Sequence, residues 1–279
     1  MDIFKHEFYK IASKKITYIL MLAFMCIYTY TTKCYYTWNN AISWNRIIDF
    51  CFKSGSLYTG IIALIILCPR FTNEYVLDTY SIIACTKHGK KKFITAKITS
   101  SIVFISLVNL FFHIFNLVLN YKFKGLEGFN EPLQVLNKYT LSPYNYTILQ
   151  FWFIQILINT LGIIAFSIFI LYLSSATNFI LKVFFIGGLV FTLPFPFREL
   201  KYFSIEWIIK YLSYTDFIRV QSLFNKPRVY SLFGITIQHK NLMYLFITIL
   251  SIIFINKIYK KVANKTSLCH LYRRHTSQS

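Results

Sequence analysis

The chain has 279 residues, of which 56% are hydrophobic and only 14% are charged, against roughly 25% in an average soluble domain. This composition excludes an ordinary water-soluble fold. The net charge is +20, but the Lys and Arg residues lie at the ends of apolar blocks rather than in one patch, which argues against nucleic-acid binding and for membrane topology.

The apolar residues form six blocks of about twenty residues, the length that an α-helix needs to cross a hydrocarbon core of about 30 Å. Runs such as Ile-Ile-Ala-Leu-Ile-Ile-Leu at 61–67 lack the alternation of a membrane barrel strand. We therefore predict an all-α integral membrane protein with a single domain over residues 1–259 and a basic cytoplasmic tail over 260–279. Its six transmembrane helices are predicted at residues 16–36, 50–69, 98–121, 148–173, 180–197 and 241–259.

Lys and Arg residues are densest in short segments before the first block and between the second and third. Because positive charge close to a membrane span faces the cytoplasm, we place both termini on the cytoplasmic side of the cell membrane. Of the six cysteines, only Cys34 and Cys51 then lie on the outer side, at the span ends that border the first outer loop, where a disulfide could form, although their spacing has no diagnostic pattern.

Residues 1–15 have the periodicity of an amphipathic helix on the cytoplasmic membrane surface. One side would carry Ile3, Phe4, Phe8, Ile11 and Ala12, and the other side would carry Lys5, His6, Glu7, Lys10 and Lys14. An ordinary positive flank of the first span is the alternative interpretation.

Residues 70–97 form the cytoplasmic connection between the second and third blocks. Thr72 or Asn73 can cap a short helix here. Glu74 and Asp78 suit the positive N-terminal end of that helix, and Gly89 can close it. One face of the helix would carry Val76, Tyr80 and Ile83. Such a helix favours contact with a soluble partner, and a solvated loop is the alternative.

The remaining connections differ in length. Residues 174–179 join the fourth and fifth blocks on the inside, whereas residues 198–240 separate the fifth block from the sixth on the outside. Apolar and aromatic residues recur at helical spacing in the long connection, which is typical of an interfacial or re-entrant segment. Gly187 and Gly188 in the fifth block allow close helix contact.

Polar side chains form a stripe inside the third and fourth blocks, at Asn109, His113, Asn116, Asn120, Gln155 and Asn159. Polar groups in hydrocarbon turn inward, so the stripe either lines a translocation path or forms hydrogen bonds between helices. His113 has no acidic partner in these blocks, so we assign it no catalytic role. The chain also lacks a GxxxxGK[ST] phosphate loop, an HExxH pair and a GxSxG elbow. We expect no enzyme activity, metal or cofactor in this chain.

Together these features resemble the membrane subunits of ABC-2 type ABC transporters, including small permeases of antibiotic and lantibiotic self-protection. The start of the chain, with Glu7, Lys10 and Lys14, is similar to the connecting helix of that family. The first cytoplasmic loop of the family is similar to the stretch that contains Phe71, Glu74, Tyr75, Thr79, Gly89, Lys90, Ala96 and Lys97. Asp78 departs from the pattern, because the family often has Gly before the Thr. The long outer connection is similar to the re-entrant region of the family.

The resemblance implies a permease subunit of an exporter for an antimicrobial peptide, an antibiotic or another amphipathic compound. Two permease subunits, alike or different, would form the path. A separately encoded ATPase subunit would bind ATP and dock on residues 73–88, with residues 174–179 as a smaller contact. The implied ATPase-coupling residues are Glu74, Tyr75, Asp78, Thr79, Gly89 and Lys97. Two alternatives remain: a membrane-embedded enzyme that uses His113, and a non-transporting anchor that recruits a soluble protein through the same loop.

Overall fold

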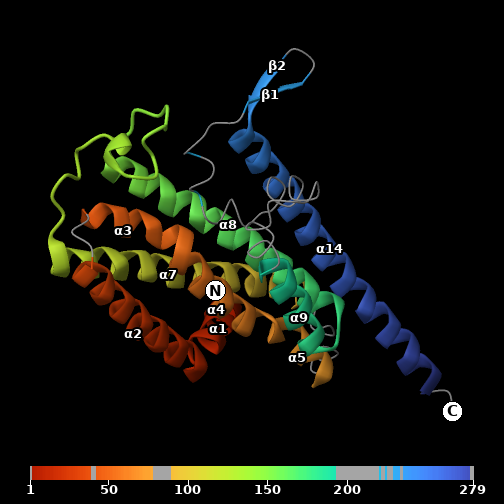
Figure 1. Ribbon diagram of the computed structural model, residues 1–279. Helices are drawn as coiled ribbons and strands as arrows, with labels where there is room; N and C mark the ends of the chain where they lie inside the picture. The colour runs from red at the N-terminus through yellow and green to blue at the C-terminus, as the bar shows by residue number, and fades with distance from the viewer. Residues whose placement is uncertain are drawn as a thin grey trace.

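A computed structural model describes residues 2–38, 42–77, 89–192, 220, 224, 229–232 and 235–276. Long helices lie side by side through most of the molecule, and a short hairpin stands at the start of the last helix (Figure 1). The elements are α1 (Asp2–Ala12), α2 (Lys15–Trp38), α3 (Ser43–Phe50), η1 (Cys51–Gly55), α4 (Ser56–Leu67), α5 (Pro69–Val76), α7 (Gly89–Lys124), η2 (Leu133–Val135), α8 (Ile148–Ala176), α9 (Ile180–Thr192), β1 (Val229–Leu232), β2 (Ile235–Gln238) and α14 (His239–Thr276).

Four helical stretches are long and apolar enough to cross a membrane: Ser43–Val76, Lys91–Lys124, Ile148–Ala176 and Asn241–Val262. The pair α1 and α2, bent by 51° at the break between them, is a fifth candidate. α9 covers the first 13 residues of the predicted fifth span, 180–197, and is about 20 Å long at 1.5 Å per residue. Residues 193–197 of that predicted span lie outside the described ranges. The described residues therefore indicate a multi-pass helical membrane protein with four or five long apolar helices.

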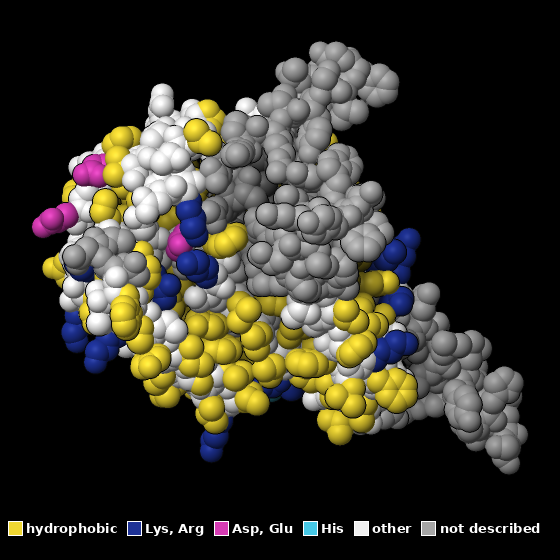
Figure 2. Space-filling view, viewed as in Figure 1, with side chains coloured by type: hydrophobic (Ala, Val, Ile, Leu, Met, Phe, Trp, Pro, Cys, Tyr) yellow, Lys and Arg dark blue, Asp and Glu magenta, His cyan; other side chains and the backbone are white. Residues whose placement is uncertain are grey.

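The surface agrees with this assignment, because hydrophobic side chains cover a broad band of the face shown in Figure 2. Large apolar side chains on several helices are more than half exposed, among them Ile19, Leu22, Leu157 and Phe185. A continuous apolar surface of this kind needs a cover, and a bilayer provides one.

The second apolar stretch begins earlier than predicted and is not one regular helix. α3, α4 and α5 follow one another along the chain, and η1 is a π-helical turn between α3 and α4. The prediction started this span at residue 50 because Arg46 and Asp49 lower the hydrophobicity of the preceding turns. In the structure α3 packs on α7 and α8 and buries Trp44 and Ile47, so it belongs to the bundle. Cys34 is a free thiol, so no disulfide joins it to Cys51.

The predicted connection over residues 70–97 is helical at both described ends. α5 begins at Pro69, so Thr72 and Asn73 lie within this helix instead of capping it. Gly89 begins α7 instead of closing a helix. These cap predictions are wrong because Pro69, taken as the end of a span, suits the first turn of a new helix.

The C-terminal part differs from the prediction in two ways. β1 and β2 pair in antiparallel fashion, with Val229 opposite Gln238 and Leu232 opposite Ile235. A short hairpin therefore precedes α14 in a chain whose described residues are mainly helical. Residues 198–219, the main part of the predicted re-entrant segment, lie outside the described residues. α14 continues to Thr276, so most of the predicted tail is helical. Lys and Arg residues favour the negative C-terminal end of a helix.

Two buried clusters hold the helices together. The larger one includes residues of α4, α7, α8 and α9, and Gly187 lets α9 approach closely. A Cβ atom on Gly187 would lie 2.5 Å from Ile170 Cδ1 and 2.8 Å from Leu64 Cδ2, whereas a Cβ on Gly188 would meet nothing within 4 Å. The prediction of close contact is thus confirmed for Gly187 and wrong for Gly188. The second cluster joins α3, the connection 125–147 and α8.

Candidate functional site

Four charged side chains are buried where α1, α5 and α7 meet. The Arg70 guanidinium lies 2.9 Å from the Glu7 carboxylate, and both side chains are only 3% exposed. Lys97, which is fully buried, forms an ion pair with Glu74. We call these four residues the charge cluster. Its two carboxylates balance its two cations, although the whole chain carries a net charge of +20.

Further contacts compensate the buried cations. Arg70 Nε donates a hydrogen bond to Ser101 Oγ at 3.1 Å. Lys97 Nζ lies 4.8 Å from the ring centroid of Phe71 and 4.9 Å from that of Phe93, within the range of cation–π attraction. A buried charge is tolerated only when its cost is compensated. Arg70 is both paired and hydrogen-bonded, whereas Lys97 has its carboxylate partner and two aromatic rings.

Two lysines lie at the edge of the charge cluster. Lys10 Nζ is 3.9 Å from a Glu74 carboxylate oxygen, but its side chain is 53% exposed, so the attraction is screened by water. Partial burial, together with the positive charges of Arg70 and Lys10, lowers the pKa of Lys14. The end of α1 is therefore held by the buried pair and not by its surface lysines.

A hydroxyl group ties α5 to α8 at the same end of the bundle. Ser174 Oγ donates to the carbonyl of Cys68 at 2.7 Å and accepts from the backbone N–H of Phe71 at 3.0 Å. Tyr75 OH donates to the carbonyl of Ser175 at 3.3 Å. Polar contacts therefore join α1, α5, α7 and α8 into one unit.

The six predicted ATPase-coupling residues differ in burial, and two of them lie outside the described residues. Glu74 and Lys97 are buried partners of each other, so their side chains cannot contact a docking protein. Tyr75 is half-buried and Gly89 is the first residue of α7. Two of the six lie outside the described part of the chain, namely Asp78 and Thr79. A role of these residues in coupling stays a prediction.

Other residues are accessible at this end. Val76 and Leu77, which we call the exposed end of α5, are 64% and 69% exposed. The connection predicted at 174–179 is shorter than expected, because α8 continues to Ala176 and buries Ser174 and Ser175. Residues 177–179 remain as the connection, and a partner that binds there could contact Phe179, which is exposed.

Sequence reasoning missed the pair Glu7 and Arg70. It placed Glu7 on the polar side of the first helix and treated Arg70 as part of a basic connection. Glu7 lies one helical turn before the buried Ile11, and this spacing was the local signal that it faces the bundle. No local signal identifies Arg70 as its partner, because the two residues belong to helices far apart in the sequence.

The structure buries all six residues of the predicted polar stripe, Asn109, His113, Asn116, Asn120, Gln155 and Asn159. Asn109 accepts a hydrogen bond from Thr59 of α4 and donates one to Thr160 of α8, both at 3.1 Å. His113 Nε2 lies 3.1 Å from Asn159 Oδ1. These contacts connect α7 to its neighbours.

Three members of the stripe, Asn116, Asn120 and Gln155, hold α3 in place. Asn116 Nδ2 donates to the carbonyl of Ile47 at 3.0 Å, and Gln155 Nε2 donates to the carbonyl of Ile48 at 2.9 Å. Asn120 Nδ2 donates to Asn116 Oδ1 at 2.8 Å. Amides of α7 and α8 thus bind backbone carbonyls just before the π-helical turn η1, a kind of irregularity that is frequent at functional sites.

α2 joins the stripe through two tyrosines. Tyr28 OH donates to Asn116 Oδ1 at 2.6 Å, and Tyr36 OH donates to Asn120 Oδ1 at 2.7 Å. The observed partners of the stripe are protein groups, which favours hydrogen bonding between helices over the lining of a path. In the described ranges no carboxylate forms an ion pair with His113.

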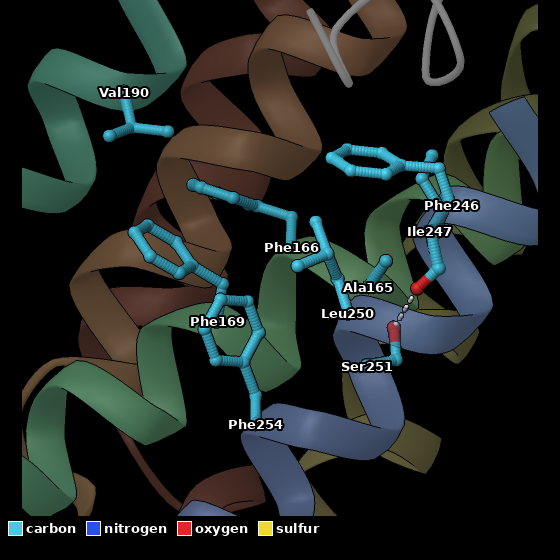
Figure 3. Close-up of a pocket in the computed structure, with 9 residues that line it drawn as sticks. All are labelled: Ala165, Phe166, Phe169, Val190, Phe246, Ile247, Leu250, Ser251 and Phe254. Carbon is cyan, nitrogen blue, oxygen red and sulfur yellow. Dashed lines mark hydrogen bonds between the residues drawn. The ribbon is translucent and has the colours of Figure 1, made fainter. Parts of the chain in front are cut away.

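An apolar cavity of about 210 Å³ lies between α8, α9 and α14 (Figure 3). Its lining residues are Ala165, Phe166, Phe169, Val190, Phe246, Ile247, Leu250, Ser251 and Phe254. The Ser251 hydroxyl donates to the carbonyl of Ile247 at 2.8 Å. Among these nine lining residues Ser251 has the one polar side chain, and its hydroxyl is already engaged, so the cavity suits an apolar group.

The chain matches no protein-family model and no curated protein sequence. Among the described residues, no group of three or more His, Cys, Asp and Glu side chains could hold a metal ion. The buried polar contacts of this site join α1 and α5 to α7 and α8.

Proposed function

We propose that this chain is the membrane subunit of an ABC exporter of the ABC-2 type. It crosses the cell membrane six times, with both termini in the cytoplasm. Two such subunits form the path, and a separately encoded ATPase subunit binds and hydrolyses ATP. The cargo is an antimicrobial peptide, an antibiotic or another amphipathic compound.

The observation that carries the proposal is the charge cluster. A membrane subunit driven by a separate ATPase needs a stiff element that passes a movement at the membrane surface to the transmembrane helices. α1 precedes the first apolar helix and α5 ends the second apolar stretch, and the buried ion pairs join both to α7. A push on either helix therefore moves the bundle.

Exposed lysines next to the charge cluster agree with the proposed orientation. The end of the bundle with the charge cluster also carries Lys5, Lys10, Lys92, Lys257 and Lys261, all of them exposed. α14 meets α7 at this end through the hydroxyls of Tyr259 and Thr95, 2.7 Å apart. Exposed lysines also lie at the opposite end, at Lys33, Lys122 and Lys124, so the orientation rests on the dense basic segments beside the predicted spans. A cytoplasmic charge cluster would face the side on which an ATPase has its nucleotide.

The contact with the ATPase is better assigned to the exposed end of α5 than to Glu74, because Glu74 is buried. Val76 and Leu77 present apolar side chains directly before the segment 78–88. Removing such exposed apolar side chains from water on docking favours association.

Replacing Val76 and Leu77 together by Glu tests this assignment. The matched control is Leu141→Glu, since Leu141 is 68% exposed in the outer connection. We expect the ATPase subunit to co-purify with the wild-type chain and the control, and to be lost with the double variant. ATP-dependent efflux of cargo from vesicles should fall in parallel. Recovery of the ATPase at wild-type yield with the double variant would refute the contact.

The same vesicles separate the alternatives. A non-transporting anchor would bind the ATPase without any cargo-dependent efflux. A membrane-embedded enzyme would lose an activity in His113→Ala, whereas an exporter needs this residue only for the hydrogen bond to Asn159.

A further inference from the structure

The cavity between α8, α9 and α14 has walls that suit a hydrocarbon chain. Phe166 and Phe169 of α8 and Phe246, Leu250 and Phe254 of α14 point toward it (Figure 3). Its volume of about 210 Å³ exceeds the roughly 150 Å³ of an apolar cavity that stays dry and binds benzene. A segment of an acyl chain therefore fits.

The cavity is open to the surface of the bundle. Two of its lining residues, Val190 and Phe246, are themselves exposed. The neighbouring outward faces of α9 and α14 also expose apolar side chains, including Leu189 and Ile249. A molecule dissolved in the bilayer can therefore enter from the side.

Two lysines continue the same face of α14 beyond the cavity. Lys257 and Lys261 follow Phe254 at steps of three and four residues, which keeps all three on one side of the helix. Their Nζ atoms lie 5.9 and 5.4 Å from the ring centroid of Tyr172. The same ring stacks on Phe254, with centroids 5.0 Å apart. Tyr172 thus adjoins both the cavity wall and the two cations.

The two lysines have no counter-charge in the described part of the chain. None of the carboxylates there forms an ion pair with Lys257 or Lys261. Lys261 lies seven residues beyond Phe254, about 10 Å along the helix axis. An apolar wall therefore ends next to two exposed positive charges, at the end of the bundle that is rich in lysine.

We propose that this site binds an anionic phospholipid of the bilayer, with one acyl chain in the cavity and the phosphate on Lys257 and Lys261. Basic pockets beside transmembrane helices suit anionic headgroups. A cationic peptide is disfavoured here, because the two lysines repel it. An uncharged apolar molecule would occupy the cavity without any use of the lysines.

Native mass spectrometry of the purified protein in detergent tests the headgroup. Phosphatidylglycerol and phosphatidylcholine with identical acyl chains are the probes, and phosphatidylglycerol should bind more tightly. A basic residue near a headgroup contributes roughly fivefold to the attraction of an anionic lipid. We therefore expect Lys257→Gln with Lys261→Gln to weaken phosphatidylglycerol binding about 25-fold and to leave phosphatidylcholine binding unchanged.

The control for overall charge is Lys5→Gln with Lys92→Gln, which removes two exposed lysines from α1 and α7. This pair should bind phosphatidylglycerol as the wild type does. An equal loss in both pairs, or no loss in the first, would overturn the headgroup assignment.

The acyl-chain site is tested by filling the cavity. Ala165→Leu fills it from α8 and Ser251→Leu fills it from α14, so one variant remains informative if the other does not fold. Either folded variant should retain less of both lipids, and undiminished retention overturns the proposal. These measurements need neither ATPase nor cargo. Their failure would leave the transport proposal standing, and failed transport would leave the lipid site standing.

Discussion

Loss of one partner of the buried pair Glu7 and Arg70 should release α1 from the bundle. In Arg70→Met the Glu7 carboxylate would remain almost fully buried without its cation. Removing one partner of a buried ion pair costs about 3 to 5 kcal/mol. Because a 51° bend separates α1 from α2, α1 can relieve this cost by undocking while the other helices stay packed.

The undocked population should therefore rise roughly 150- to 4,000-fold, since each 1.4 kcal/mol is a factor of about ten. Hydrogen exchange of the α1 backbone amides in detergent measures this population directly. Glu7→Leu should accelerate exchange by a similar factor. The double variant Glu7→Leu with Arg70→Met should recover most of the protection, because an apolar pair of similar volume leaves neither residue as an unpaired buried charge.

Lys10→Met is the matched control on the same helix. Lys10 is half exposed and 3.9 Å from Glu74, so its removal should cost less than about 1 kcal/mol and speed exchange by less than about fivefold. Wild-type exchange of α1 in Arg70→Met would refute the inference that the ion pair holds this helix. A double variant that exchanges as fast as Arg70→Met would show that shape, and not charge, decides docking.

Three further substitutions test the packing of the bundle. Asn116→Leu leaves the Tyr28 hydroxyl without its acceptor and should lower stability by about 1 to 3 kcal/mol, seen as a lower thermal midpoint in detergent. Loss of transport at unchanged thermal midpoint would instead indicate that the stripe lines the path. Gly187→Ala should destabilise by about 1 to 3 kcal/mol because its Cβ overlaps Ile170, whereas Gly188→Ala should be neutral or slightly stabilising. Equal midpoints for the two glycine variants would contradict the close contact of α9.

Hydropathy was enough to find the long apolar helices, because the length and composition of a membrane span are local properties. The predicted span 148–173 agrees with α8 to within three residues. The same reasoning failed at α3, whose Arg46 and Asp49 lower the average although Trp44 and Ile47 are buried. The mean hydropathy of a segment does not show that the apolar side of a half-polar helix packs against other helices.

For the polar stripe, too, the sequence predicted the burial of the side chains but not their partners. The spacing of Asn109, His113 and Asn116 placed their side chains on one face of a helix, and the structure buries all three. Their partners come from α2, α3, α4 and α8, so the choice between a path and interhelical bonding depended on contacts that no periodicity reports.

The buried charges depended most on tertiary structure. Glu74 and Lys97 looked like surface residues of a docking loop, and Glu7 looked like part of a solvated helix face. A charge is stable inside only when an opposite charge is brought to it, and here the opposite charges come from helices that are distant in the sequence. Composition therefore predicted a membrane protein whose basic residues lie at the ends of its apolar segments. Folding decided which of its few acidic residues join the helices and which lysines remain exposed.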